Sequence, residues 1–277
     1  MTGSFFRKVS GFCLTCVLAC FTGGAAGAQE QGGADDLAAK TQNPIASMIS
    51  LPFENNFDFG APNGGAWIMN VQPVIPFTVG DWNLVSRIIA PIASAPGGVV
   101  TAGNPSPVGR GRAFGLGDIN YSLFFSPANS GAFTWGVGPS INIPSATDSR
   151  LGAGKFSIGP TAVVLTQPKP WSVGVLARQI WSVAGPSGRA DTNQFMLQPF
   201  VNYNFDKGWY VYSDPAIVAN WNADDIFTVP VGGGVGRIFT IGKQAMNVRG
   251  GAFYNVVKPD AAPETVAKLT VQFLFPK

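Results

Sequence analysis

The feature that most constrains the fold is a period of two in the placement of apolar side chains. In the segment 133–144, Phe133, Trp135, Val137 and Ile141 fall on one face, whereas small and polar residues fall on the other. Successive side chains of a β-strand point to opposite faces, so this period predicts a strand. No stretch of the chain shows a sustained helical period.

Twelve candidate strands share this alternation, and most are about 10 to 13 residues long. They are expected at 48–57, 66–77, 82–92, 114–125, 133–144, 155–166, 171–184, 193–205, 209–222, 227–239, 244–257 and 264–275. Strands of soluble proteins are typically about five or six residues long, whereas a strand that crosses a bilayer needs about nine to eleven. The lengths therefore predict membrane-spanning strands.

The connections alternate in length along the chain. Those after the second, fourth, sixth, eighth and tenth strands are tight, whereas longer loops are expected at 93–113, 145–154 and 185–192. Aromatic residues such as Phe77 and Trp82 flank the tight turns, as in the aromatic belts of outer-membrane barrels. An even strand number then places both termini on the short-turn, periplasmic side.

A sheet with open edges is costly in hydrocarbon because its backbone groups find no water to bond. We therefore expect an all-β fold, a closed antiparallel transmembrane β-barrel of about 12 strands over 48–277, after a flexible periplasmic lead-in over 29–47. Arg237 falls on the lipid face by parity. This predicts either a bulge near Gly232-Gly233-Gly234 or a position of Arg237 near the membrane interface.

Residues 1–28 are typical of a cleaved signal peptide. Basic residues Arg7 and Lys8 precede a short apolar run, and Ala26-Gly27-Ala28 forms a cleavage site. The apolar run is too short for a transmembrane anchor. An alternative is lipidation at Cys20, although Leu18 is large for a lipoprotein box.

Composition excludes several classes of function. The chain has no histidine, which removes Ser-His-Asp hydrolysis, HExxH zinc sites and histidine-ligated haem. All three cysteines lie in the signal peptide, so the mature chain has no disulfide and no thiolate metal site. The mature chain has 16 basic residues (18 minus Arg7 and Lys8) and 15 acidic residues. Its net charge is therefore close to zero, which gives no indication of nucleic-acid binding. We expect no enzyme activity, catalytic residue, cofactor or metal.

Charged residues on the inward faces are the candidates for lining the lumen. By parity they are Glu54, Arg87, Asp118, Arg178, Asp214, Arg249 and Lys268. Opposed acids and bases across a pore favour a wet, weakly selective channel. The same residues are also consistent with internal salt bridges that fill the lumen, because buried charges need partners.

Several short motifs resemble a bacterial outer-membrane family of the phenol meta-cleavage pathway, which is transporter-like and often mislabelled neuromedin U. The motifs are Asn43-Pro44-Ile45-Ala46, Leu51-Pro52-Phe53-Glu54-Asn55-Asn56, Val71-Gln72-Pro73-Val74-Ile75-Pro76-Phe77, Asp81-Trp82-Asn83-Leu84-Val85-Ser86-Arg87, Gly115-Leu116-Gly117-Asp118-Ile119, Gly159-Pro160-Thr161-Ala162, Ile241-Gly242-Lys243-Gln244 and Gln272-Phe273-Leu274-Phe275-Pro276-Lys277. The resemblance covers most of residues 43–277. It implies an outer-membrane barrel and passage of small hydrophobic or aromatic compounds, and it supplies no catalytic residues.

The expected function is therefore an outer-membrane channel for passive uptake of small hydrophobic or aromatic solutes. The alternative is a structural or surface-interaction barrel with a side-chain-filled lumen and no transport. Expected partners are outer-membrane lipid, lipopolysaccharide near the basic loop 109–112, the barrel-insertion machinery and the solutes, with no nucleic acid. Barrels commonly end on an aromatic residue, whereas here Pro276-Lys277 follow Phe275.

Overall fold

The computed structural model describes residues 29–100, 111–224 and 226–276. The expected signal peptide, with Cys20, lies outside the described residues. The elements are α1 (Gln29–Gln42), β1 (Ile49–Phe59), β2 (Ala66–Val71), β3 (Val74–Val79), β4 (Trp82–Pro96), β5 (Arg112–Leu116), β6 (Ile119–Pro127), β7 (Thr134–Ile143), β8 (Phe156–Thr166), β9 (Trp171–Ala184), β10 (Asn193–Asn204), the 3-10 turn η2 (Asp206–Gly208), β11 (Trp209–Ser213), β12 (Ile217–Asn220), β13 (Phe227–Ile241), β14 (Gln244–Val257) and β15 (Thr265–Phe275).

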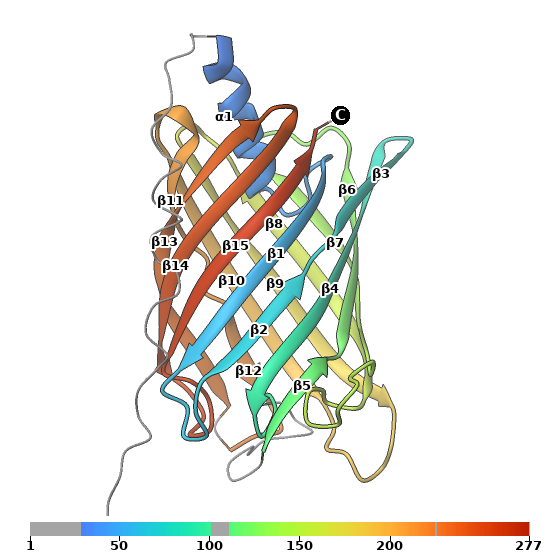
Figure 1. Cartoon of the computed structure of the whole chain (residues 1–277). Coiled ribbons are helices and arrows are strands. Elements are labelled where there is room, and N and C mark those ends of the chain that lie inside the picture. The colour runs from blue at the N-terminus through green and yellow to red at the C-terminus, as the bar shows by residue number, and fades with distance from the viewer. Residues whose placement is uncertain (1–28, 101–110, 225, 277) are drawn as a thin grey trace, which may run out of the picture.

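The fifteen β elements form one antiparallel sheet that closes into a barrel of twelve strands. The number is twelve because β2 and β3, β5 and β6, and β11 and β12 are each two parts of one strand. The first and last strands, β1 and β15, pair along their whole lengths, from Ile49 opposite Phe275 to Phe59 opposite Thr265 (Figure 1). This pairing removes the free edges, and the predicted closed 12-stranded barrel is confirmed.

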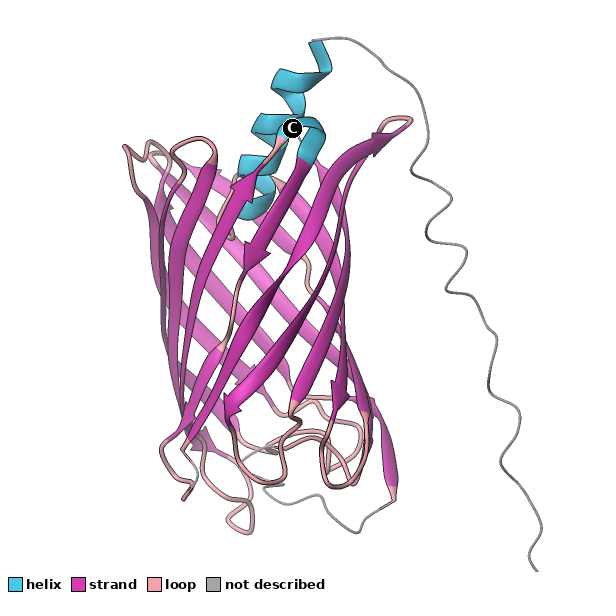
Figure 2. Ribbon diagram, turned by 90° about the vertical axis from the view of Figure 1, so that its left-hand side faces the viewer, coloured by secondary structure: helices cyan, strands magenta, loops and turns pink. Residues whose placement is uncertain are grey.

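The two ends of the barrel differ in the length of their connections (Figure 1). At one end, the short-turn end, tight connections such as Gly80-Asp81 and Gly242-Lys243 join neighbouring strands. The C-terminus of β15 and helix α1 lie at the same end (Figure 2). The loop 144–155 and the loop 185–192 extend from the opposite, long-loop end.

The two faces of the barrel wall carry opposite chemistry. Along β8, Ser157, Thr161 and Leu165 point inward and are buried, whereas Ile158 and Val164 point outward and are exposed. Large exposed apolar side chains recur on every side of the barrel. A soluble protein rarely exposes so much contiguous apolar surface, whereas a barrel in lipid requires an apolar outer face.

Aromatic side chains gather on the outer face at both ends of the strands. At the short-turn end, exposed Trp82 contacts exposed Trp135 with ring centroids 6.3 Å apart. At the long-loop end, Trp221 contacts Phe227 at 6.0 Å. Two belts of aromatic residues, one at each end of the strands, are expected where amphipathic side chains meet the two lipid–water interfaces.

Arg237 lies near the short-turn end of β13, and its register there is regular. The guanidinium carbon stacks 5.2 Å from the ring centre of Trp209, which is on the outer face. The irregularity in the β13–β14 ladder falls at Val229/Pro230 instead. Of the two alternatives, the interface position therefore holds, and no bulge at Arg237 is needed.

Three strands that the sequence predicts as continuous are interrupted. The breaks fall at Gln72-Pro73, at Gly117-Asp118 and at 214–216. Proline supplies no N–H to the ladder, so Pro73 and Pro215 account for two of the breaks. A Cβ on Gly117 would press against the side chain of Pro91 and the carbonyl oxygen of Leu151. The third break, at Gly117-Asp118, therefore lies where the loop that contains Leu151 packs closely against the strand.

Residues 29–42 form helix α1, where the sequence predicts a flexible lead-in. Gly32-Gly33 disfavours a helix, but Leu37 and Ala38 pack against an apolar cluster that includes Tyr210 and Ile238. Tertiary packing rather than intrinsic propensity therefore stabilises the helix. No helix in the described part of the chain is long and apolar enough to cross a membrane.

Candidate functional site: the lumen of the barrel

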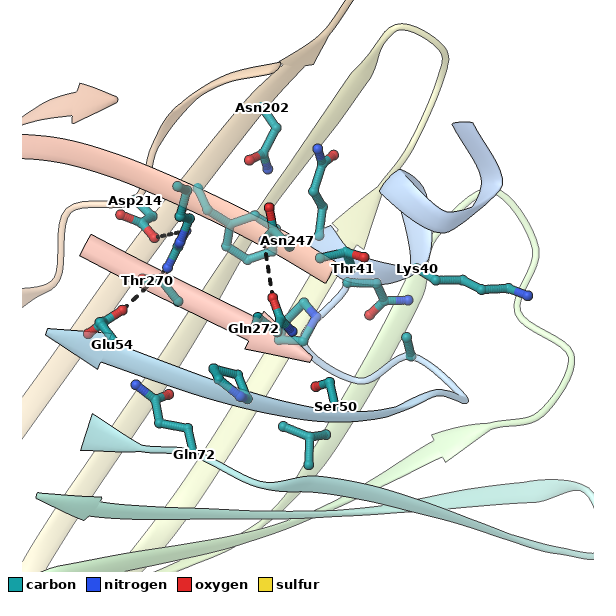
Figure 3. A pocket seen from close by; sticks show the side chains of 18 of the residues that line it. Lys40, Thr41, Ser50, Glu54, Gln72, Asn202, Asp214, Asn247, Thr270 and Gln272 are labelled. Carbon is teal, nitrogen blue, oxygen red and sulfur yellow. Dashed lines mark hydrogen bonds and ion pairs between the residues drawn. The ribbon is translucent and has the colours of Figure 1, made fainter. Parts of the chain in front are cut away.

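A cavity of about 160 Å³ lies inside the barrel, between the end of helix α1 and the middle of the strands (Figure 3). Its wall is drawn from opposite sides of the barrel. Lys40 to Pro44 close it on the side of the short-turn end, and β1, β4, β9, β10, β14 and β15 surround it. The lining presents polar and apolar surface in nearly equal amounts. Its polar side chains include Glu54, Gln72, Arg87, Asn202, Asp214, Asn247, Arg249 and Gln272.

Four charged residues on one side of the lumen form an ionic cluster, namely Glu54, Asp214, Arg249 and Lys268. Arg249 lies at its centre, with Nη1 2.7 Å from Asp214 Oδ2 and Nη2 3.3 Å from Glu54 Oε2 (Figure 3). Lys268 Nζ lies 4.0 Å from Asp214 Oδ1. All four side chains are less than a quarter exposed, so these pairs are weakly screened.

Aromatic rings support the two cations of the ionic cluster. The guanidinium carbon of Arg249 lies 4.8 Å from the ring centre of Tyr212, and Lys268 Nζ lies 4.6 Å from that of Phe253. The negative faces of the rings attract the cations. Arg249 is therefore held by two carboxylates and a ring at once, which fixes its orientation.

A hydrogen-bonded row of neutral side chains lies beside the ionic cluster. Tyr210 Oη donates to Asn247 Oδ1 at 2.8 Å, and Asn247 Nδ2 donates to Gln272 Oε1 at 3.1 Å. Tyr210 and Asn247 are nearly inaccessible to solvent. The row links β11, β14 and β15 and orders this wall of the lumen.

Two further arginines lie elsewhere on the lumen wall. Arg87 on β4 lines the cavity and donates from Nη2 to Gln72 Oε1 at 2.8 Å. Arg178 lies on the inward face of β9, two residues beyond Leu176, which lines the cavity. Neither arginine forms an ion pair with a carboxylate among the described residues.

Asp118 lies apart from the other predicted lumen residues, at the break between β5 and β6. Its Oδ2 accepts a hydrogen bond from Ala153 N at 2.7 Å, and its Oδ1 accepts one from Ala146 N at 3.3 Å. Both donors belong to the loop 144–155. Asp118 therefore anchors that loop to the barrel rather than facing the cavity.

The loop 144–155 folds over the long-loop end and is held by several charged groups. Arg189 donates to the carbonyl oxygens of Gly152 at 2.6 Å and Ser149 at 2.7 Å. Leu151 is 3% exposed and packs with Ala93 and Ala113. The loop is thus a packed cover on this side of the lumen.

Two loop carboxylates have shifted titration. The side chain of Arg150 donates hydrogen bonds to Asp148 and lowers the pKa of that carboxyl from 3.8 to about 2. Hydrogen bonds from Lys155 and Ser182 likewise lower the pKa of Asp191. Both carboxyls are therefore ionised at neutral pH.

Residues 37–48 occupy the short-turn end of the lumen. Ile45, 3% exposed, packs with Phe124 and Leu165 on the inward faces of β6 and β8. Gln42 Nε2 donates to Asn204 Oδ1 at 2.7 Å, and Gln167 Nε2 donates to Ala39 O at 2.8 Å. The segment therefore narrows this end of the lumen.

The lumen carries no group of His, Cys, Asp and Glu residues, three or more together, that could hold a metal ion within the described ranges. The carboxylates of Glu54 and Asp214 are bonded to cations, and that of Asp118 to loop amides. What the wall offers is fixed charge and hydrogen-bonding capacity around a small cavity.

Parity brings Glu54, Arg87, Asp214 and Arg249 to one cavity and places Lys268 beside them, with Arg178 nearby and Asp118 apart. Two contributors are absent from the sequence-based set. Tyr210 has inward parity, but it is uncharged and so falls outside a set restricted to charged side chains. Residues 40–46 have no alternation, and only the docked helix places them in the lumen.

No protein-family model matches the sequence, and no curated protein matches it. Solved structures do match. An outer-membrane channel from Pseudomonas putida F1 is similar with a TM-score of 0.59 and 14% identity, over 82% of this chain and 94% of the channel. The NanC porin is similar with a TM-score of 0.50 and 8% identity, over 83% of this chain and 100% of the porin. At these identities, the likeness shows that the chain has the fold of outer-membrane channels and porins.

Proposed function

We propose that this protein is an outer-membrane channel through which small hydrophobic or aromatic solutes cross by passive diffusion. The cavity carries the proposal, because a partly empty space with both polar and apolar lining lies inside a closed wall whose outer face is apolar. A barrel that served only as a scaffold needs no such space. The wall confines a solute, and its charges select among solutes.

The proposed setting combines the fold with the export signal expected from the sequence. The barrel lies in the outer membrane with its short-turn end toward the periplasm and its long loops outside, among lipopolysaccharide. Residues 1–28 direct export and are cleaved, and the insertion machinery assembles the barrel. Fold neighbours that are channels and porins support a transport role rather than an enzyme.

The proposed class of solute rests on the motif resemblance to the phenol meta-cleavage family. Membership of that family is proposed from these motifs, since no family model matches the sequence. The cavity gives independent support, because a cavity of about 150 Å³ in another protein holds one benzene molecule. A single aromatic ring therefore fits the volume available here.

A second candidate function is a structural barrel with no transport. The observation that favours it is the packing of Ile45 and Ala38 into the short-turn end. In that case, residues 37–48 form a permanent closure. In the proposed channel, the same segment narrows the exit.

Uptake into liposomes distinguishes the two candidates. Purified protein reconstituted in liposomes should admit a small aromatic solute, such as phenol or benzoate, faster than sucrose and faster than protein-free liposomes do. Because neutral phenol crosses bilayers unaided, the charged probe gives the cleaner comparison. Uptake no faster than in protein-free liposomes for every solute would favour the structural barrel.

A further inference from the structure

The charges of the lumen do not balance. In the ionic cluster, Glu54 and Asp214 are matched by Arg249 and Lys268, and their carboxylates are bonded to those cations. Arg87 and Arg178 add two positive charges, and neither forms an ion pair with a carboxylate in the described structure, although Glu54 lies near enough to attract Arg87. These six side chains together therefore carry an excess of two positive charges.

Arg178 is the less satisfied of the two arginines. Its Nε is buried and has no hydrogen-bond partner. A guanidinium offers five N–H donors, and a buried charge without partners is costly. Arg87 donates to the neutral Gln72 side chain and to no carboxylate in the described structure. Both groups therefore have donors to spare for an anion.

Hydroxyl groups line the wall between the two arginines. Arg87 is opposite Ser122, which is opposite Ser140, and Thr161 is opposite Arg178 on the next strands. Ser122 Oγ donates to Ser140 Oγ at 2.9 Å. The wall from β4 to β9 is thus polar but uncharged, and no acid lies there to neutralise the arginines.

An apolar surface adjoins the arginines on the side of the cavity. Leu176 and Phe200 line the cavity together with Arg87, and Val74 lies on the same side. These three side chains belong to the apolar packing that also holds Ile45. The site thus presents a hydrophobic face beside a pair of cations.

We propose that Arg87 and Arg178 form a binding site for the carboxylate of a small monoaromatic acid, whose ring lies against Leu176 and Phe200. This rests on the proposed channel function and narrows its solute class from aromatic compounds to aromatic carboxylates. The planar guanidinium fork matches a carboxylate in two parallel hydrogen bonds. An incoming carboxylate supplies the negative charge that the wall lacks.

Benzoate binding to the full-length mature protein in detergent tests the site, measured by isothermal titration calorimetry with benzyl alcohol as the uncharged comparison. The test variant is Arg87→Gln with Arg178→Gln. The matched control is Lys207→Gln with Lys243→Gln, which removes the same charge from exposed turns at the short-turn end. Circular dichroism checks that each variant keeps its β-structure.

Wild-type protein and the lysine control should bind benzoate at least tenfold more tightly than the arginine variant, and benzyl alcohol should bind the arginine variant and wild type alike. In planar bilayers under a KCl gradient, the reversal potential of wild type should indicate preference for chloride, and the arginine variant should lose part of it. Equal benzoate affinity in wild type and the arginine variant would overturn the site.

The two proposals fail separately in this design. Benzoate binding that depends on the arginines, without any conductance, would keep the binding site and reject the channel. Conductance with unchanged benzoate affinity and reversal potential in the arginine variant would keep the channel and reject the site. If the single variant Arg178→Gln folds and the double variant does not, the same comparison is made with the single variant.

Discussion

Arg249 and Asp214 form an ion pair of 2.7 Å although their strands are not neighbours, because β13 lies between β14 and β11 in the sheet. The inward face of β13 is made of glycines where the pair crosses it. A Cβ on Gly234 would collide with Tyr212, and one on Gly236 would collide with Tyr210. The glycine run that the sequence presents as a bend thus leaves room for a polar contact over the strand.

Replacement of Arg249 by leucine should destabilise the barrel. It would leave Glu54 without its cation and Asp214 with Lys268 alone at 4.0 Å. Removing one partner of a fully buried pair costs about 3–5 kcal/mol, and we expect less here because the pair is partly exposed, with Arg249 at 22% and Glu54 at 16%. The urea midpoint in detergent should fall clearly, whereas Arg249→Lys should fall less. An unchanged midpoint for both variants would show that the ionic cluster contributes nothing to stability.

Removal of residues 29–42 should widen the short-turn end. Gln42 at the end of helix α1 donates a hydrogen bond to Asn204, and Ala38 of the helix is buried, but no strand pairs with the helix. The barrel should therefore still form, and single-channel conductance should rise several-fold. Asp36→Ala, on an exposed position of the same helix, is the matched control and should conduct like wild type. Equal conductance of the truncated protein and wild type would mean that the helix does not restrict the path.

Asp118→Ala should loosen the loop 144–155 at the other end. The carboxylate accepts hydrogen bonds from Ala153 N and Ala146 N, each worth about 1 kcal/mol or more. Trypsin should then cut after Arg150 at least tenfold faster, as followed by mass spectrometry of the fragments. Asp81→Ala, in a tight turn at the opposite end, should leave this cut unchanged. Equal cutting in Asp118→Ala and wild type would show that Asp118 does not hold the loop.

Asp148 should remain ionised far into the acid range. Hydrogen bonds from Arg150 lower its pKa to about 2 from the usual 3.8. Because the pKa is lower in the folded chain, the contact stabilises the loop above about pH 4 and is lost as pH falls toward 2. Carbon NMR of the carboxyl should give a midpoint near 2, and Arg150→Gln should return it toward 3.8. A wild-type midpoint near 3.8 would contradict the contact.

Strand number, closure and most approximate strand positions follow from the sequence because lipid and lumen enforce a strict alternation. Along β9, for example, Trp171 and Val173 face out, and Ser172 faces in, as parity predicts. The observed bounds of β9, Trp171–Ala184, are those expected from the sequence. Each side chain of a membrane strand faces either the lipid or the lumen. An apolar residue therefore indicates the outward face, and a polar residue indicates the inward face.

The site is only partly predictable, because its partners come from non-neighbouring strands and from outside the barrel. Parity gives the inward direction of Asp214 and Arg249, but their contact depends on the glycines of β13. Asp118 has inward parity as well, yet a break in the strand turns it toward the loop. Helix α1 has no apolar period to mark it, and packing inside the barrel stabilises it.

Single-channel recording in planar bilayers tests most directly whether the closed barrel is a path through the membrane. Purified full-length mature protein should give discrete, voltage-independent conductance steps that are small compared with those of a wide general porin, because residues 37–48 and the ionic cluster narrow the lumen. The truncated protein without residues 29–42 should give larger steps in the same membranes. Folded, inserted protein that gives no steps in either form would contradict the channel.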